Sequence, residues 1–319
     1  MGSASGVRWS AAGGATISPP RSGHTAAVDA QGTVWLFGGY AEDGERRVTN
    51  DVWKLDGESW ERVVLEGGGP GPRLCSASCI VGSRFLLFAG WDPQETGTGG
   101  VILDDVWALD LENLAWEKLG TVPRGPVSRH VAVATPRGVV LHTFRCLESV
   151  LVFDGNEWTE QPTAGEAPSS RGLHSAALVG DEVVVFGGAD KAGDMRADAW
   201  GLDTRTWTWR RLAGDSDGPT PRAGSCASSY GTTFLVCCGA ERGATGGLVP
   251  RSDAWALDVQ TGKWTLLIDD PTALRPRNAA TLSGPLRHRK SDDDTLVFAL
   301  HGGWHPFVET FDDTHFLEI

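Results

Sequence analysis

One order of signals recurs along the whole chain, and this repetition limits the fold more than any other feature. A tryptophan closes a short strand-like segment about every 42 to 56 residues, at Trp9, Trp60, Trp116, Trp158, Trp209 and Trp264. Periods of this length are typical of repeat architectures, which are built from one structural unit used several times. The chain therefore divides into six units.

The unit over residues 20–63 shows the signals in full. A Pro-Arg turn is followed by an apolar strand ending in Phe-Gly-Gly, a polar loop, an Asp-Val-Trp-x-Leu strand and a last strand with Trp60. The aspartate of the third strand recurs at Asp51, Asp105, Asp198, Asp253 and Asp313. With 42 glycines and 17 prolines in 319 residues, and apolar runs of only a few residues, strands are favoured over helices. Four short strands per unit predict one blade of a propeller.

The two ends of the chain complement each other. The last unit stops after three strands, whereas residues 7–10 form a strand with no unit before them. Joining them closes the ring without an open sheet edge. We therefore predict an all-β fold, a single six-bladed β-propeller domain over residues 1–319 with four antiparallel strands per blade. Its predicted blades are 10–65, 66–121, 122–164, 165–214, 215–268, and 269–319 completed by the N-terminal strand at 6–10.

Charge and hydropathy exclude several classes of partner. The net charge of −13 and a pI near 5.0 argue against a nucleic-acid or anionic membrane surface. No apolar run is long enough to span a bilayer, and the N-terminus lacks the basic and apolar segments of a secretory signal. We expect a cytoplasmic protein. The six cysteines form no C-x-x-C pair, which predicts free buried thiols.

Arginines at the unit starts are the first candidate binding residues. Guanidinium groups suit the recognition of carboxylate or phosphate. Five arginines occupy the same position in the turn of their units, in phase with the repeat, and a sixth is shifted by two residues. All six are expected near one mouth of the channel. A seventh arginine replaces a Gly-Gly position of the third unit. The five in phase can instead be buried ties between blades. The set comprises Arg21, Arg73, Arg171, Arg222 and Arg277, then Arg129, and finally Arg145.

Residues just after the Gly-Gly positions are predicted to open onto the same mouth. They combine aromatic and charged side chains, as interaction sites do, although the tryptophans can equally pack under long loops. These candidates are Tyr40, Trp91, Asp92, Asp190, Glu241, Trp304 and His305. Together with the arginines they predict a shallow pocket with a basic centre and aromatic walls.

The repeated pattern of Pro-Arg-x-x-His, apolar-Gly-Gly and a distal tryptophan resembles the kelch-repeat β-propellers over essentially the whole chain. The ending His301-Gly302-Gly303 with Phe311-Asp312-Asp313 is similar to plant-type kelch proteins related to thiocyanate-forming and nitrile-specifier proteins. That resemblance implies non-haem iron held by a Glu-x-x-x-Asp-x-x-x-His motif. The comparable positions here are Glu241, Thr245 and Val249, two of which are unsuitable iron ligands.

Three histidines begin inner strands and could form a metal ring, or they could bond a neighbouring blade's backbone: His24, His130 and His174. We favour the second interpretation and predict no cofactor and no metal, with Fe(II) as the alternative. The predicted function is a module that docks a protein or peptide through its mouth, with an acidic anchor; a small molecule is a second ligand class. The alternative is a specifier-type, lyase-like enzyme, which the missing iron motif weakens.

Overall fold

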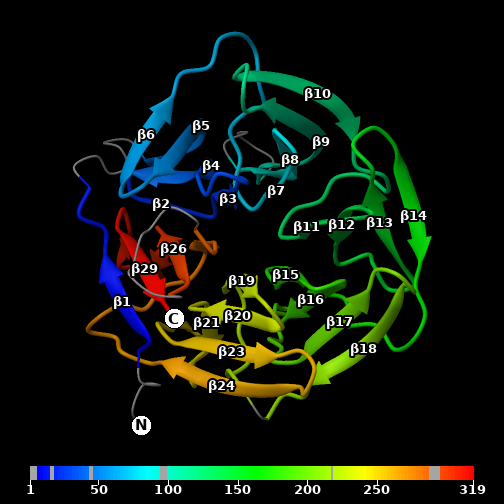
Figure 1. Cartoon of the computed structure of the whole chain (residues 1–319), viewed down its shortest axis with the longest axis vertical. Helices are drawn as coiled ribbons and strands as arrows, with labels where there is room; N and C mark the ends of the chain where they lie inside the picture. The colour runs from blue at the N-terminus through cyan, green and yellow to red at the C-terminus, as the bar shows by residue number, and fades with distance from the viewer. Residues whose placement is uncertain (1–5, 15–17, 43–45, 94–98, 217, 287–294) are drawn as a thin grey trace.

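The computed structural model spans residues 1–319 and describes residues 6–14, 18–42, 46–93, 99–216, 218–286 and 295–319. Six blades surround a central axis, as Figure 1 shows; five have four strands, and the inner strand of the first blade is divided into two short pieces. The predicted all-β six-bladed propeller with four antiparallel strands per blade is confirmed. No helix in the described part of the chain has the length and apolar character needed to cross a membrane.

The first three blades are built from strands that follow each other in sequence. Blade 1 contains β2 (Arg21–Ser22), β3 (Thr25–Val28), β4 (Val34–Glu42), β5 (Arg46–Asp56) and β6 (Ser59–Val63). Blade 2 contains β7 (Ala77–Val81), β8 (Arg84–Asp92), β9 (Val101–Asp110) and β10 (Ala115–Thr121). Blade 3 contains β11 (Val131–Thr135), β12 (Gly138–His142), β13 (Ser149–Phe153) and β14 (Trp158–Pro162).

Among the last three blades, blades 5 and 6 carry hairpins outside their main sheets, and blade 6 takes one strand from the N-terminus. Blade 4 contains β15 (Ser175–Val179), β16 (Glu182–Phe186), β17 (Ala199–Asp203) and β18 (Thr208–Ala213). Blade 5 contains β19 (Cys226–Tyr230), β20 (Thr233–Cys237), β23 (Ala254–Asp258) and β24 (Lys263–Ile268), with the hairpin β21 (Ala240–Arg242) and β22 (Leu248–Pro250). Blade 6 contains β25 (Thr281–Ser283), β26 (Val297–His301) and β29 (Thr314–Glu318), with the hairpin β27 (Trp304–His305) and β28 (Glu309–Thr310).

Ring closure follows the prediction. Strand β1 (Arg8–Ala11) pairs antiparallel with β29 and is the outer strand of blade 6, with Trp9 opposite Leu317. An ion pair between Arg8 and Glu318 adds to this junction. The N-terminal strand thus removes the open edge that the last three strands would otherwise present.

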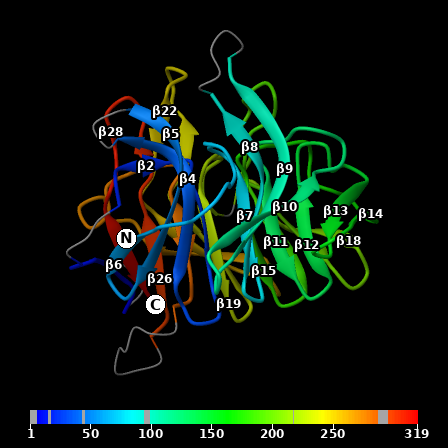
Figure 2. The ribbon, with the colours of Figure 1, turned by 90° about the horizontal axis from the view of Figure 1, so that it is seen from above.

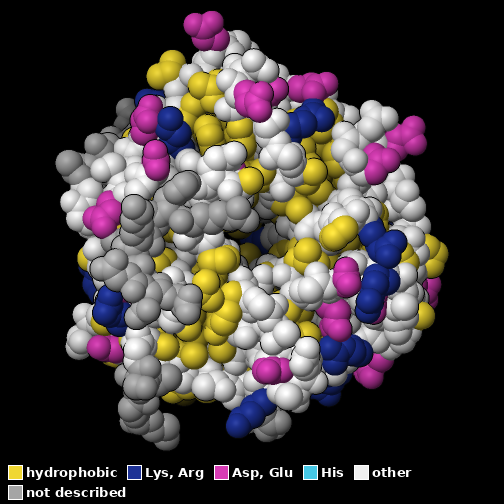
Figure 3. Space-filling model, viewed as in Figure 1, with side chains coloured by type: hydrophobic (Ala, Val, Ile, Leu, Met, Phe, Trp, Pro, Cys, Tyr) yellow, Lys and Arg dark blue, Asp and Glu magenta, His cyan; other side chains and the backbone are white. Residues whose placement is uncertain are grey.

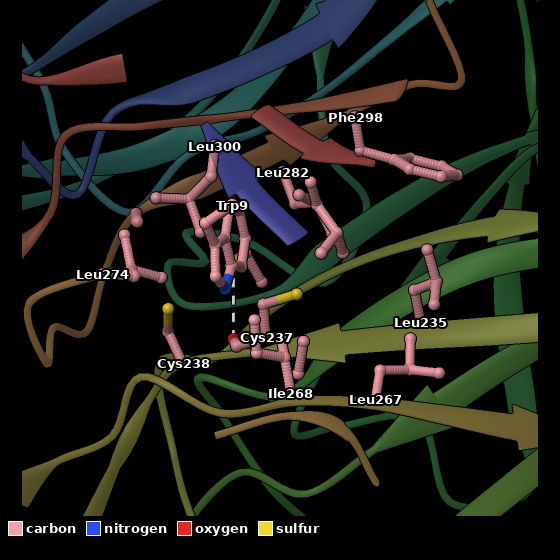
Figure 4. Packing of buried hydrophobic residues seen from close by; sticks show 14 of the residues in the cluster. Trp9, Leu235, Cys237, Cys238, Leu267, Ile268, Leu274, Leu282, Phe298 and Leu300 are labelled. Atoms are coloured by element: carbon pink, nitrogen blue, oxygen red, sulfur yellow. Dashed lines mark hydrogen bonds between the residues drawn. The ribbon is translucent and has the colours of Figure 1, made fainter. Parts of the chain in front are cut away.

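The tryptophans of the outer strands fill the wedges between blades. Figure 4 shows Trp9 of the last blade among Leu300 and Leu282 of its own blade and Cys237 and Ile268 of blade 5. In the other five blades the indole ring of the tryptophan packs against a residue on an inner strand of the preceding blade. The centroid distances are 4.4 Å for Trp60–His301, 5.6 Å for Trp116–Phe37, 6.0 Å for Trp158–Phe88, 5.5 Å for Trp209–His142 and 5.3 Å for Trp264–Phe186. Each repeat therefore completes its core only against its neighbour.

The six cysteines are free thiols, five of them buried, as predicted. Figure 3 shows the ring hollowed at its centre, with charged side chains gathered toward the outer rim of the face drawn there.

Candidate binding site at the channel mouth

Six backbone hydrogen bonds form a closed belt around the axis. In each blade one residue just before the inner strand donates its N–H to the carbonyl of the equivalent residue in the preceding blade, at 2.9–3.0 Å. All six have positive φ, between 53° and 65°. They are Gly23, Cys75, Arg129, Leu173, Gly224 and Ala279. The belt links every blade to the next without any side chain, and it forms only when the ring closes.

A cavity of about 830 Å³ lies over this belt, and all six belt residues line it. Its walls are largely apolar. Part of this wall comes from the hairpins β21–β22 and β27–β28, which project from the same face, as Figure 2 shows. The lining includes Tyr40, Leu74, Trp91, Met195, Leu248, Trp304, Phe307 and Val308. A concave, largely apolar pocket with few polar groups is the usual form of a ligand site.

Arg129 is the only charged member of the belt. The structure places its exposed side chain in the cavity, with the guanidinium carbon 5.6 Å from the centroid of the Trp91 ring. It also lies beside Cys75, where burial raises the pKa of the thiol and Arg129 acts in the opposite direction. No carboxylate among the described residues forms an ion pair with Arg129, so its charge is available to an anion in the mouth.

The five in-phase arginines lie elsewhere. All are at most 2% exposed, and each guanidinium binds the aspartate of the third strand in its own blade. In blade 5, Arg222 donates to both carboxylate oxygens of Asp253 at 2.6 and 2.9 Å and to the Cys238 carbonyl at 3.0 Å. The other pairs are Arg21–Asp51, Arg73–Asp105, Arg171–Asp198 and Arg277–Asp313.

These arginines are therefore internal ties, and the prediction that they face a ligand in the mouth is corrected. The physical reason is strand register: the turn arginine and the aspartate meet across the blade, and burial makes this pairing obligatory. Burial alone raises the pKa of Asp198, but hydrogen bonds from Arg171 and Trp200 and the charge of Arg171 bring it below its ordinary value.

Blade 3 lacks the tie altogether. The belt residue follows the tie arginine by two positions in the other five blades, so Val127 occupies the arginine position of blade 3. The aspartate position holds Ser149, which instead accepts a hydrogen bond from Arg124 at 2.9 Å. Both partners are replaced together, which leaves no unpaired buried charge. The offset of Arg129 is thus explained, because it belongs to the belt and not to the ties.

The other predicted residues occupy different parts of the rim. Tyr40, Trp91 and Trp304 line the mouth cavity. Arg145 and Asp190 line an adjoining groove over blade 3, and Glu241 lines a separate depression next to Arg242. Asp92 ends β8 and His305 ends β27, and neither lines these cavities. Four residues that line the cavities were not predicted from the sequence: Leu248, Phe307, Phe144 and Lys191. For Phe307 a signal was available, because it is an apolar residue in a polar loop after Gly-Gly.

Charges are distributed unevenly around the mouth. Glu42 and Glu309 lie on the side of blades 1 and 6, where Glu309 pairs with Arg275 at 2.8 Å. Arg129 and Arg242 lie on the side of blades 3 and 5. Arg242 donates to the Gly193 carbonyl at 2.9 Å, which positions its side chain at the rim. The site therefore has an acidic and a basic side.

The inner histidines are packed and neutral. His174 and His142 share a hydrogen bond of 3.0 Å, and His24 bonds Thr281 of blade 6 at 3.0 Å. Burial lowers the pKa of His130 to about 4 and that of His142 to about 3. The hydrogen bonds of His24 and His174 join two side chains, whereas the prediction was a bond to the backbone of the neighbouring blade.

The described residues contain no group of three histidine, cysteine, aspartate or glutamate side chains able to hold a metal ion. At the positions compared with the iron motif, Glu241 forms an ion pair with Arg251, and Val249 is exposed on β22. Only Glu241 could therefore serve as one of the three iron ligands that the motif needs.

Comparison with known proteins identifies the repeat. The family described as KLHDC2/KLHL20/DRC7 Kelch-repeats domain matches residues 7–154 and 138–319. The chain belongs to the kelch-repeat family. This kelch propeller is 25% identical to Kelch domain-containing protein 1 of Homo sapiens, covering 82% of this chain and 72% of the relative. It is 25% identical to Kelch domain-containing protein 2 of Bos taurus, covering 81% and 57%.

The host cell factor homolog hcf-1 of Caenorhabditis elegans is 26% identical over 73% of this chain and 36% of the relative. The kelch propeller thus spans about a third of that relative's length. Among solved structures, YjhT has the same fold, with a TM-score of 0.73, 17% identity, and coverage of 94% of this chain and 96% of that one. Kelch-repeat propellers are typically protein-binding modules.

Proposed function

We propose that this kelch propeller binds an extended segment of a partner protein in its channel mouth, with a carboxylate of that segment on Arg129. The observation that supports this most directly is the position of Arg129. It is the one charged residue of a belt whose other members are Gly, Cys, Leu, Gly and Ala, at the floor of a cavity of about 830 Å³. An arginine fork pairs with a carboxylate through two parallel hydrogen bonds.

Apolar residues of the same segment fill the remaining cavity. The hairpin tips of blades 5 and 6 expose Phe307 at 93%, Val308 at 69% and Leu248 at 39% of their surface. Trp304 and Phe307 also contact each other, with ring centroids 5.5 Å apart. Exposed aromatic groups around a charged anchor are typical of binding hot spots. The specifier-type enzyme has no comparable supporting observation in this site.

A random-peptide display selection against the purified propeller tests this function. Arg129→Leu is the decisive variant because Leu173 occupies the equivalent belt position with φ of 56°, so the backbone accepts leucine there. We expect selected peptides to bind this variant about tenfold to a hundredfold more weakly, as the loss of charge-assisted hydrogen bonds requires. Arg137→Leu, at the exposed turn before β12, is the matched control. Equal affinity for wild type and Arg129→Leu refutes the proposal.

A further inference from the structure

The rim of the mouth is interrupted at blade 3. Between β12 and β13 only residues 143–148 intervene, whereas residues 238–253 of blade 5 and 302–313 of blade 6 carry the hairpins that wall the mouth. A groove of about 350 Å³ lies at this low point. It shares Arg129, Leu173 and Ala189 with the mouth cavity, so the two spaces adjoin.

Two further cations line this groove beside one aromatic ring. The Arg145 guanidinium carbon lies 4.8 Å and the Lys191 amine 5.4 Å from the centroid of Phe144. Nη1 of Arg145 donates hydrogen bonds to the carbonyls of Arg124 at 2.8 Å and Gly125 at 3.2 Å, which hold its side chain in place. No carboxylate in the described ranges pairs with Arg145 or Lys191.

The acidic residue of the groove does not neutralise these cations. Asp190 accepts N–H groups from Ala192 at 2.9 Å and Asp194 at 3.0 Å, and it pairs with Arg196 at 3.0 Å. Backbone hydrogen bonds, with that from Asp194 first, and the charge of Arg196 hold the pKa of Asp190 below its ordinary value. Neighbouring cations without an anion repel each other, and an oxyanion between them removes this repulsion.

We propose that this groove is a second subsite for an oxyanion, a carboxylate or phosphate on a side chain of the segment that occupies the mouth. The segment leaves the mouth through the low rim of blade 3, and this side chain binds between Arg145 and Lys191. The inference rests on the proposed function and adds the direction of the bound segment to it. A cationic groove in a chain of net charge −13 also steers acidic segments toward this side of the ring.

The test uses the display library described above and the double variant Arg145→Gln/Lys191→Gln. Peptides selected on wild type are expected to carry an acidic residue at a constant spacing from the anchor, and to bind the double variant about tenfold or more weakly. Arg137→Gln/Lys263→Gln removes two exposed charges elsewhere and should leave affinity unchanged. Changing the acidic peptide residue to its amide should weaken binding to wild type and leave binding to the double variant as it was.

The source of the oxyanion is decided by replacing the acidic peptide residue with phosphoserine. Tighter binding assigns a phosphate, and weaker binding assigns a carboxylate. Peptides that depend on Arg129 but bind the double variant like wild type would overturn the second subsite and leave the proposed function standing. Peptides indifferent to Arg129, or a library without binders, would refute the proposed function and this inference with it. Thermal unfolding of each variant separates lost binding from lost folding.

Discussion

The tie between Arg222 and Asp253 should show strong coupling when its partners are replaced by the residues of blade 3. Arg222→Val alone leaves Asp253 without its cation, and Asp253→Ser alone leaves a guanidinium that is 1% exposed without its anion. Breaking a buried pair by removing one partner costs about 3–5 kcal/mol. If the two costs were independent, the double variant would lose about 6–10 kcal/mol.

The double variant should lose much less than that sum. With both charges gone, the remaining costs are the cavity and the acceptors that Arg222 satisfied, chiefly the Cys238 carbonyl and Thr220. Unpaired buried groups cost about 1–3 kcal/mol each, so we expect a total of about 3–5 kcal/mol. The coupling between the two sites is then about 3–5 kcal/mol, at or above the upper end of the range for contacting residues.

Urea unfolding followed by tryptophan fluorescence measures these differences. A domain is stabilised by only about 5–15 kcal/mol, so each single variant should unfold at a clearly lower urea concentration than wild type. Glu61→Gln breaks the exposed pair with Lys54, 3.1 Å long, and should have little effect. Additive losses in the double variant would refute the reasoning, because they would mean that the charges do not depend on each other.

Three further changes test the rest of the structure. Trp9→Ala should cost about 3–5 kcal/mol in chemical denaturation because it empties the wedge between the last two blades, and unchanged stability would contradict ring closure. Gly188→Ala should lower the melting temperature, since its Cβ would lie 2.8 Å from the Gly172 carbonyl at φ of 90°; a melting curve like wild type would contradict this strain. The pKa of buried His130 is about 4 against 6.5 when unfolded, so the unfolded state binds more protons and stability falls as pH drops from 6.5 toward 4. His130→Ser, which copies Ser76, should reduce that loss by about 1–2 kcal/mol in urea titrations between pH 7 and 5, and an unchanged slope would contradict it.

Much of the architecture could be predicted because it depends on periodic local signals. The spacing of the tryptophans predicted the blades, and the incomplete last unit predicted the role of strand β1. The roles of the arginines were harder to predict, because arginines at the same mouth either form a buried tie with an aspartate or line the cavity. Arg222 and Arg129 both precede inner strands, and only the register across the blade shows that one meets an aspartate and the other does not.

By itself, the sequence determined the repeat, the number of blades and the closure of the ring, since these follow from hydrophobic and turn residues that act on their nearest neighbours. Tertiary structure alone decided which charged side chains line the mouth cavity and the adjoining groove. The belt that carries Arg129 and the groove that carries Arg145 and Lys191 are formed by loops from separate blades. The belt is complete only in the closed ring, and the groove forms only where neighbouring blades meet, so their shared chemistry is a property of no single repeat.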